Sequence, residues 1–128
     1  MMNLEKDRIK LNEYRDFFAC GITPEDADML GAICLNTGVM LTDGAGDDKE
    51  QHRMGMDYLQ LALDVYQFAA QSTSMNKYRQ LFYEAFDRLM PLAEEDDNEE
   101  LLLQLQMRLL KFAKLRDLCD VWYKGKPL

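Results

Sequence analysis

With 128 residues, of which 48% are hydrophobic and 30% charged, the chain has the length and composition of one folded domain and not of a disordered protein. Its formal net charge of −8 disfavours direct binding to nucleic acid, because phosphates would repel it. The charged N-terminus and the lack of a long apolar run argue against a signal peptide and a transmembrane helix. We therefore expect a cytoplasmic protein without membrane contact.

Apolar residues recur every three or four positions along almost the whole chain. This spacing predicts an all-α fold of about five antiparallel helices, arranged as a small bundle or as stacked helical hairpins. The first helix is expected from about Asn3 to Cys20, with Gly21 just past its end. Residues 23–26, Thr-Pro-Glu-Asp, predict the start of the second helix, since they combine a capping hydroxyl, a proline in the first turn and two acids.

The second helix is expected to break at residues 42–48, which are rich in Asp and Gly. The third helix is predicted from about Lys49 to Ser72 and the fourth from about Met75 to Met90, stopping at Pro91 because proline lacks an amide hydrogen. An acidic run over residues 94–100 leads into the last helix, which is expected to end near Tyr123. We expect residues 1–128 to form a single domain.

Charge is unevenly distributed along the chain. Between Asp16 and Asp64 there are ten acidic residues and only two basic ones, Lys49 and Arg53, whereas the segment from Leu101 onward has six basic and two acidic residues. One region therefore suits a partner with a basic surface and the other an acidic one, or the two regions pack together.

No pattern in the sequence indicates catalysis, a cofactor or a metal ion. The single histidine, His52, lacks the partner ligands of a metal site and is expected to be a solvated surface residue. Residues 43–50 do not have the ligand spacing of a calcium loop and are interpreted as an acidic loop. Three cysteines without a Cys-x-x-Cys spacing, Cys20, Cys34 and Cys119, predict reduced, mostly buried thiols.

Several residues are candidates for contact with a partner protein. Most methionines fall on apolar stripes and are expected to fill the core, with the alternative that some line a groove for a partner helix. Met56 lies off the stripe of the third helix. An aromatic pair near the basic end is of the kind enriched at binding hot spots, with core packing as its alternative. The candidate contact residues are Met56, Asp47, Asp48, Lys111, Lys114, Trp122 and Tyr123.

The segment from Thr37 to Ala62 resembles one unit of a tetratricopeptide-type helical repeat in its longer, Sel-type form. Residues that match that pattern are Gly38, Gly44, Gly46, Tyr58 and Ala62. Residues that depart from it are Thr37, Leu41, Glu50, Met54, Asp57 and Leu61. The resemblance covers about a fifth of the chain, and it implies a scaffold that binds a peptide or protein on a concave face.

Three functions follow as hypotheses. The first is a non-catalytic acidic interaction module, such as an adaptor, a chaperone or an inhibitor of a protein partner, with self-association left open. The second is a regulator of nucleic-acid machinery, acting by acidic mimicry of DNA or through a basic last helix. It requires the acids of residues 16–64 to share one face. The third is a small ligand-binding protein or enzyme, which requires a pocket between helices.

Overall fold

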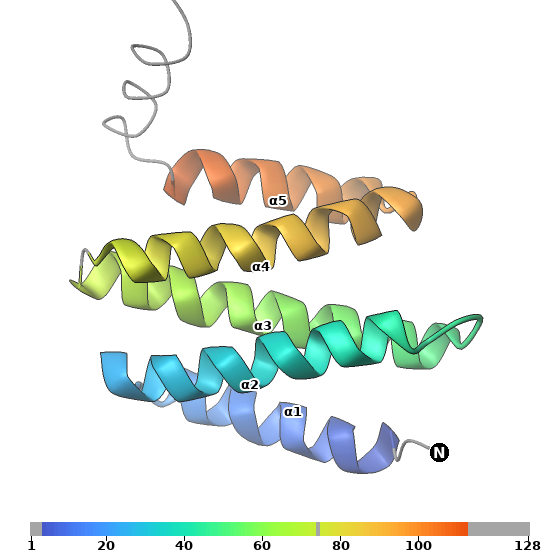
Figure 1. Cartoon of the computed structure of the whole chain (residues 1–128), viewed down its shortest axis with the longest axis horizontal. Helices are drawn as coiled ribbons and strands as arrows, with labels where there is room; N and C mark the ends of the chain where they lie inside the picture. Colours follow the sequence, from blue (N-terminus) through green and yellow to red (C-terminus); the bar gives the residue numbers. More distant parts are fainter. Residues whose placement is uncertain (1–3, 74, 113–128) are drawn as a thin grey trace, which may run out of the picture. The chain divides into compact units, whose positions relative to one another are not determined.

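The computed structural model describes residues 4–73 and 75–112, and this part of the chain contains five α-helices and no β-strand (Figure 1). The all-α prediction is thus confirmed. The helices are α1 (Leu4–Ala19), α2 (Pro24–Asp43), α3 (Lys49–Thr73), α4 (Asn76–Glu95) and α5 (Glu99–Phe112). Within the described residues, no helix has both the length and the apolar character that crossing a bilayer requires.

The chain divides into two compact units, Met1–Leu92 and Ala93–Leu128. The first unit contains α1, α2, α3 and most of α4, and the second contains the last turn of α4 and all of α5. The expectation of a single domain over residues 1–128 stays a prediction.

Helix α2 begins as its sequence predicts. The Thr23 hydroxyl accepts a hydrogen bond from the Asp26 amide at 3.2 Å, and the Asp26 carboxylate accepts one from the Thr23 amide at 3.1 Å. These reciprocal bonds satisfy two of the amides that a helix start leaves without a partner. Gly21, just after α1, has φ +103°, a conformation that glycine adopts without steric cost.

A short turn over residues 44–48 connects α2 to α3 and makes them an antiparallel hairpin (Figure 1). Asp48 caps α3, because its side chain accepts a hydrogen bond from the Gln51 amide at 3.1 Å. The buried Gln51 side chain donates at 3.1 Å to the carbonyl of Leu41, one of the carbonyls near the end of α2. The two helix ends therefore hold each other in register.

Glycines let the backbones of α2 and α3 approach closely. A Cβ added at Gly38 would lie 2.7 Å from Leu59 Cγ and 3.0 Å from the carbonyl oxygen of Gly55. A Cβ at Gly55 would lie 2.6 Å from Thr42 Cγ2 and 2.9 Å from the Thr42 backbone nitrogen. These separations are shorter than van der Waals contact, so only glycine fits at either position.

Helix α1 packs on α3 mainly through aromatic side chains. The hydroxyl of Tyr58, a residue that is 1% exposed, donates a hydrogen bond to the carbonyl of Asp7 at 2.6 Å. The rings of Tyr14 and Tyr58 meet edge to face with centroids 6.5 Å apart, as do those of Phe18 and Phe68 at 6.0 Å. Tyr58 therefore ties the start of α1 to the middle of α3.

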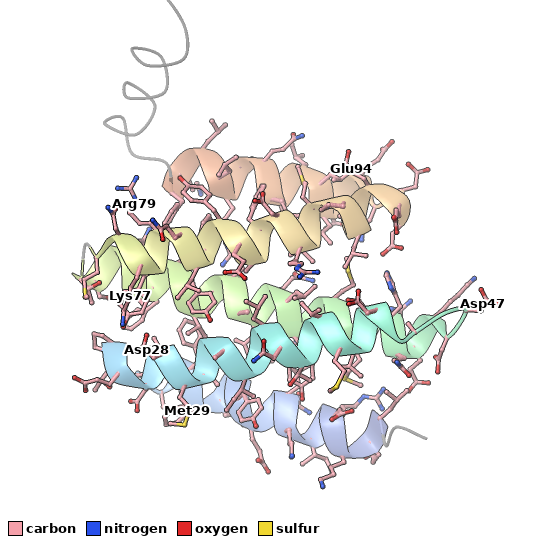
Figure 2. The ribbon with its side chains drawn as sticks, in the orientation of Figure 1. Asp28, Met29, Asp47, Lys77, Arg79 and Glu94 are labelled. Carbon is pink, nitrogen blue, oxygen red and sulfur yellow. The ribbon has the colours of Figure 1, made fainter. Side chains whose placement is uncertain are left out.

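Helix α4 contacts α2 near the start of that helix. Tyr78 is buried and donates a hydrogen bond through its hydroxyl to the carbonyl of Pro24 at 3.2 Å. Lys77 forms an ion pair with Asp28 at 3.3 Å, and Figure 2 shows these two side chains pointing toward one another. The first turn of α4 is thereby connected to the first turns of α2.

The prediction that α4 stops at Pro91 is wrong, because the helix continues to Glu95. Proline removes one amide but leaves the following residues free to stay helical, and Pro91 is exposed, so water can reach the carbonyl that loses its donor. The end of α4 is closed by Asp97, which lies two residues after the helix and has φ +54°. The Asn98 and Asp97 amides donate to the carbonyls of Ala93 at 3.1 Å and Glu94 at 3.0 Å, the pattern of a Schellman motif.

Candidate partner-binding surface

One face of α2 is apolar and open to solvent. Met29 is 63% exposed and Met40 57% exposed, and Ile33 lies half-buried between them. Their spacing of four and seven residues places all three on one side of the helix, over a length of about 16 Å. Figure 2 shows Met29 pointing away from the ribbon at the start of α2. We call these three residues the methionine face.

The methionine face is a second apolar surface on a helix that already has a buried one. The opposite side of α2 supplies core residues, among them Ala27, Leu30, Cys34 and Leu41, all at most 3% exposed. The expectation that methionines on apolar stripes fill the core is confirmed for Met54. It is wrong for Met29, Met40, Met75 and Met107, which are about half exposed or more. Helix α2 has so many apolar residues that periodicity alone does not reveal which of its faces is buried.

Acidic side chains flank the methionine face at both ends. Glu25 and Asp28 lie in the first turns of α2 and Asp43 in its last, whereas no lysine or arginine occurs between Pro24 and Asp43. Asp47 follows in the turn, and Figure 2 places Asp28 and Asp47 toward opposite ends of the α2–α3 hairpin. The surface is therefore apolar in the middle and negative at its ends.

Among the predicted contact residues, Met56 requires a correction. It is only 5% exposed and belongs to the core, because α3 is buried on more than one side, with Met54, Met56, Tyr58 and Leu59 all at most 5% exposed. A residue off the main stripe of such a helix is still covered. Met56 is not available at the surface.

The other predicted residues have different positions. Asp47 is exposed, and Asp48 caps α3, so the latter has a structural role. Lys111 is exposed on α5, in the second unit. Lys114, Trp122 and Tyr123 lie outside the described residues. Sequence reasoning did not single out Met29 and Met40, although their separation of eleven residues, three helical turns, was a usable signal.

The structure also shows where the histidine and two of the three cysteines lie. His52 is half-buried near the start of α3, not fully solvated as expected. Cys34 is buried, and this burial raises the pKa of its thiol to about 12. Cys20 is exposed just after α1, and Cys119 lies outside the described residues. Within residues 4–73 and 75–112, no three His, Cys, Asp or Glu side chains are grouped closely enough to hold a metal ion.

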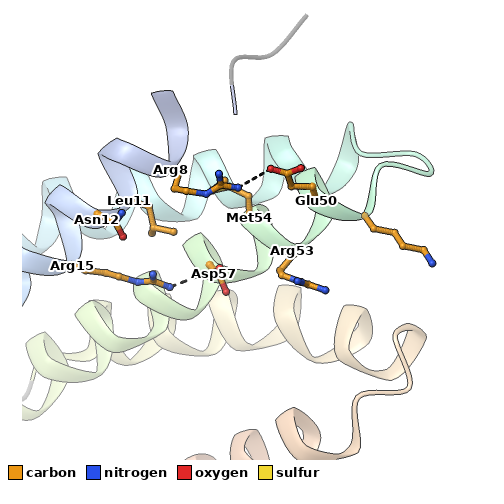
Figure 3. A pocket seen from close by; sticks show the side chains of 9 residues that line it. Arg8, Leu11, Asn12, Arg15, Glu50, Arg53, Met54 and Asp57 are labelled. Atoms are coloured by element: carbon orange, nitrogen blue, oxygen red, sulfur yellow. Dashed lines mark hydrogen bonds and ion pairs between the residues drawn. The ribbon is translucent and has the colours of Figure 1, made fainter. Parts of the chain in front are cut away.

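A pocket of about 520 Å³ lies between α1 and α3 (Figure 3). Arg8 and Arg15 line it from α1, and Lys49, Arg53 and Asp57 line it from α3. The remaining lining residues are Leu11, Asn12, Glu50 and Met54. Leu11 and Met54 are at most 4% exposed, so the pocket has an apolar floor beneath a charged rim. We call it the arginine pocket.

Ion pairs cross the arginine pocket at a regular interval. Arg8 Nη2 lies 2.7 Å from Glu50 Oε1, and Arg15 Nη2 lies 3.9 Å from Asp57 Oδ2. The two arginines are seven residues apart on α1, and the two acids are seven residues apart on α3. Because the earlier arginine pairs with the earlier acid and the later with the later, the two helices run in the same direction here. This matched spacing was a sequence signal for the pocket, but it became recognisable only once α1 and α3 were known to be neighbours.

Different causes shift the pKa values in the two ion pairs. The hydrogen bond to Glu50 raises the pKa of Arg8, as the nearby negative charge favours its protonated form. At Asp57, desolvation raises the pKa of the carboxyl above its ordinary value even though Arg15 and Arg53 act in the opposite direction. The attraction of Arg15 and Arg53 therefore does not fully offset the desolvation of the Asp57 carboxylate.

The ten acids of residues 16–64 do not share one face. Glu25, Asp26 and Asp28 lie at the start of α2 and Asp43, Asp47 and Asp48 at its other end, whereas Glu50 and Asp57 face α1 across the arginine pocket. Several are engaged in caps or ion pairs, namely Asp26, Asp28, Asp48, Glu50 and Asp57. This arrangement therefore does not provide the row of free carboxylates that mimicry of DNA requires.

Comparison of the chain with protein-family models, with curated proteins and with solved structures found no match. The resemblance of residues 37–62 to a tetratricopeptide-type repeat stays a hypothesis. In the structure this segment comprises the end of α2, the turn and the first half of α3.

Proposed function

We propose that the protein is a non-catalytic interaction module whose methionine face binds a basic, amphipathic helix of a partner protein. The observation that supports the proposal is the combination of exposed Met29 and Met40 with an acidic helix that has no basic residue. A partner helix with an apolar stripe and lysines or arginines at its edges complements both features. A cytoplasmic location, which fits the expectation of reduced cysteines, belongs to the same proposal.

The chemistry of methionine suits such a contact. Its unbranched, polarisable side chain adapts to partners of different shape, and burying one methionine contributes roughly 1.5–3 kcal/mol. The flanking acids, Glu25 and Asp43 above all, would attract a basic partner and set its orientation. This electrostatic contribution is screened by salt, so the association rate should fall as ionic strength rises.

A binding experiment with a model partner tests the proposal. The probe is a short synthetic amphipathic peptide of leucine and lysine, compared with a peptide of leucine and glutamate that has the same apolar face. We expect saturable binding of the lysine peptide and none of the glutamate peptide in isothermal titration calorimetry. The double variant Met29→Gln/Met40→Gln should raise the Kd at least about tenfold, because two apolar contacts are lost.

Met75→Gln is the matched control. Met75 is 48% exposed and lies just before α4, so the same chemical change is made on a residue that is not part of α2 or of the methionine face. Its Kd should stay within about twofold of the parent value, a difference of about 0.4 kcal/mol. Equal losses in the control and in the double variant would show non-specific attraction between an acidic protein and a basic peptide, and the proposal would then be rejected.

A further inference from the structure

The arginine pocket concentrates positive charge in an acidic protein. Four basic side chains (Arg8, Arg15, Lys49 and Arg53) and two acidic ones (Glu50 and Asp57) line it, which gives the pocket a net charge of +2 in a chain whose net charge is −8. Arg8 and Arg15 come from a different helix than the other four residues. The fold therefore collects the two basic residues of the acidic segment 16–64 and places them with the arginines of α1.

Some of these basic side chains do not form close ion pairs with the acids beside them. Arg8 is engaged by Glu50 at 2.7 Å and by Glu5 at 3.7 Å. Arg15, in contrast, is 3.9 Å from Asp57, beyond hydrogen-bonding distance, and Arg53 forms no ion pair with any residue that the structure describes. Figure 3 shows Asp57 on α3 with Arg15 on one side and Arg53 on the other. Guanidinium donors thus remain available on both sides of one carboxylate.

From this arrangement we propose that the arginine pocket binds a small organic phosphate, with the phosphate group between Arg15 and Arg53 and the organic part on Leu11 and Met54. The planar guanidinium group donates two parallel hydrogen bonds to phosphate oxygens, which an ammonium group cannot do. A phosphate monoester carries close to two negative charges at neutral pH, which matches the net charge of the pocket.

The volume and the floor of the pocket define the class of ligand further. A volume of about 520 Å³ lies within the range of small-molecule sites and exceeds what a bare phosphate ion fills. Leu11 and Met54 are 2% and 4% exposed, so they form a fixed apolar surface at the bottom. A phosphate ester with an apolar or aromatic group uses both parts of the site, whereas inorganic phosphate uses only the rim.

Asp57 competes with the ligand for the same guanidinium groups. Its carboxyl occupies the place between Arg15 and Arg53 where an incoming phosphate would accept hydrogen bonds. Because desolvation raises the pKa of Asp57, its ionised form is poorly compensated in the free protein. Removing this charge should therefore favour the phosphate, a direction of change that partial unfolding of a variant cannot imitate.

The test is a titration of the full chain with phenyl phosphate, followed by ¹H–¹⁵N NMR of the backbone amides and of the arginine Nε–H groups. We expect saturable shifts at Arg15 and Arg53, and weaker binding of inorganic phosphate. Phenyl sulfate has the same shape with one charge fewer and should bind at least about fivefold more weakly, a difference of about 1 kcal/mol. Absence of saturable shifts at millimolar phenyl phosphate, or equal binding of the sulfate, would overturn the proposal.

Variants separate the pocket from general electrostatics. Arg15→Gln and Arg53→Gln should each weaken phenyl phosphate binding about tenfold or more, because a charge-assisted hydrogen bond is lost. Lys10→Gln makes the same charge change on an exposed residue of α1 outside the pocket and should leave the Kd within about twofold. Asp57→Asn should tighten binding a few-fold, about 1 kcal/mol. Equal losses in Lys10→Gln and Arg53→Gln, or no gain in Asp57→Asn, would refute the site.

This inference does not depend on the proposed protein partner. The Met29→Gln/Met40→Gln variant should bind phenyl phosphate like the parent, and Arg53→Gln should bind the leucine–lysine peptide like the parent. The two proposals can thus fail separately.

Discussion

Helix α3 makes two different kinds of contact inside the first unit, one with α2 and one with α1. Against α2, the glycines at positions 31, 38 and 55 leave no space for even one methyl group, and the ring of Tyr66 fills the place beside Gly31. Against α1, side chains make the contact: the rings of Tyr14 and Phe18 pack on Tyr58 and Phe68, and beside them charged side chains line a pocket of about 520 Å³. The same helix therefore has one contact made by close backbone approach and one made by side chains, with a charged pocket at its edge.

The difference explains why the two contacts serve different purposes. Glycine-mediated packing is short-range and dry, so it stabilises the hairpin and offers nothing to a ligand. Arginine and lysine side chains cost conformational entropy to fix and hold their charges in water, so they stabilise little and leave binding capacity at the surface. The comparison predicts that substitutions at the α2–α3 contact alter stability, whereas those at the arginine pocket alter binding.

At neutral pH, the largest effect is expected for Gly55→Ala. The new methyl group would meet the backbone nitrogen of Thr42 at 2.9 Å and Thr42 Cγ2 at 2.6 Å, and a backbone atom cannot move aside alone. We expect the free energy of unfolding to fall by about 2 kcal/mol in urea denaturation, although alanine is the better helix former by about 1 kcal/mol.

Thr42→Ser tests whether the contact with Thr42 Cγ2 causes this loss of stability. It removes Cγ2 and keeps the hydroxyl that donates to the Gly38 carbonyl at 2.9 Å. Combined with Gly55→Ala it should recover about 1 kcal/mol, which a double-mutant cycle measures. If Gly55→Ala were as stable as the parent protein, α2 and α3 would be farther apart than the structure places them.

At alkaline pH, stability is expected to fall because of two buried groups in this part of the core, Cys34 and Tyr66. Burial raises the pKa of Cys34 from 9.0 to about 12 and that of Tyr66 from 10.0 to about 12. Both stay protonated in the folded state while the unfolded chain ionises, so stability is unchanged below about pH 9 and falls above it. The loss should approach about 1.4 kcal/mol per pH unit for each group.

Urea denaturation between about pH 8 and pH 11 measures this loss, and Cys34→Ala should delay its onset to about pH 10, where tyrosine begins to ionise in the unfolded chain. An onset that stays at pH 9 in Cys34→Ala would mean that another group is responsible.

An intermediate effect is expected for Tyr58→Phe at the contact between α1 and α3. The hydroxyl of Tyr58 is buried and donates to the Asp7 carbonyl at 2.6 Å, so its removal should cost about 1 kcal/mol. Tyr14→Phe is the matched control, because Tyr14 is the other ring of the same aromatic pair. Its hydroxyl makes no hydrogen bond with the residues that the structure describes. Thermal denaturation measures the loss of stability in each variant, and equal losses would contradict the role of this hydrogen bond.

The smallest effect on stability is expected for Asp57→Asn. The raised pKa of Asp57 means that the ionised carboxyl is less favourable in the folded than in the unfolded state, so stability declines as pH rises through its titration. The neutral amide should therefore raise the free energy of unfolding at neutral pH slightly, by less than about 1 kcal/mol, because Asp57 is only half-buried and solvent screens its charge. A clear loss of stability would show that its ion pair with Arg15 matters more than desolvation. The same variant has its main effect on phosphate binding, which is the separation that the comparison predicts.

Local chemistry was sufficient to predict the helices and most of their ends. The capping groups at Thr23, Asp48 and Asn98 act on amides three residues away, and this range is short enough to read along the chain. Pro91 shows the limit of such rules, because the local preference against proline was weaker than the favourable capping available at Asp97 and Asn98.

Only the tertiary structure decided which apolar and charged residues are exposed. Periodicity showed that α2 is apolar, but its glycines, and not its methionines, face α3, because close backbone contact excludes side chains from that side. The prediction that Met56 lies at the surface was wrong because α3 is covered on more than one side, so few of its side chains reach solvent. The arginine pocket joins residues about 40 positions apart, and no local signal relates Arg15 to Asp57 until two helices separated in sequence become neighbours. Secondary structure follows from interactions between near residues, whereas a binding surface depends on which helices meet.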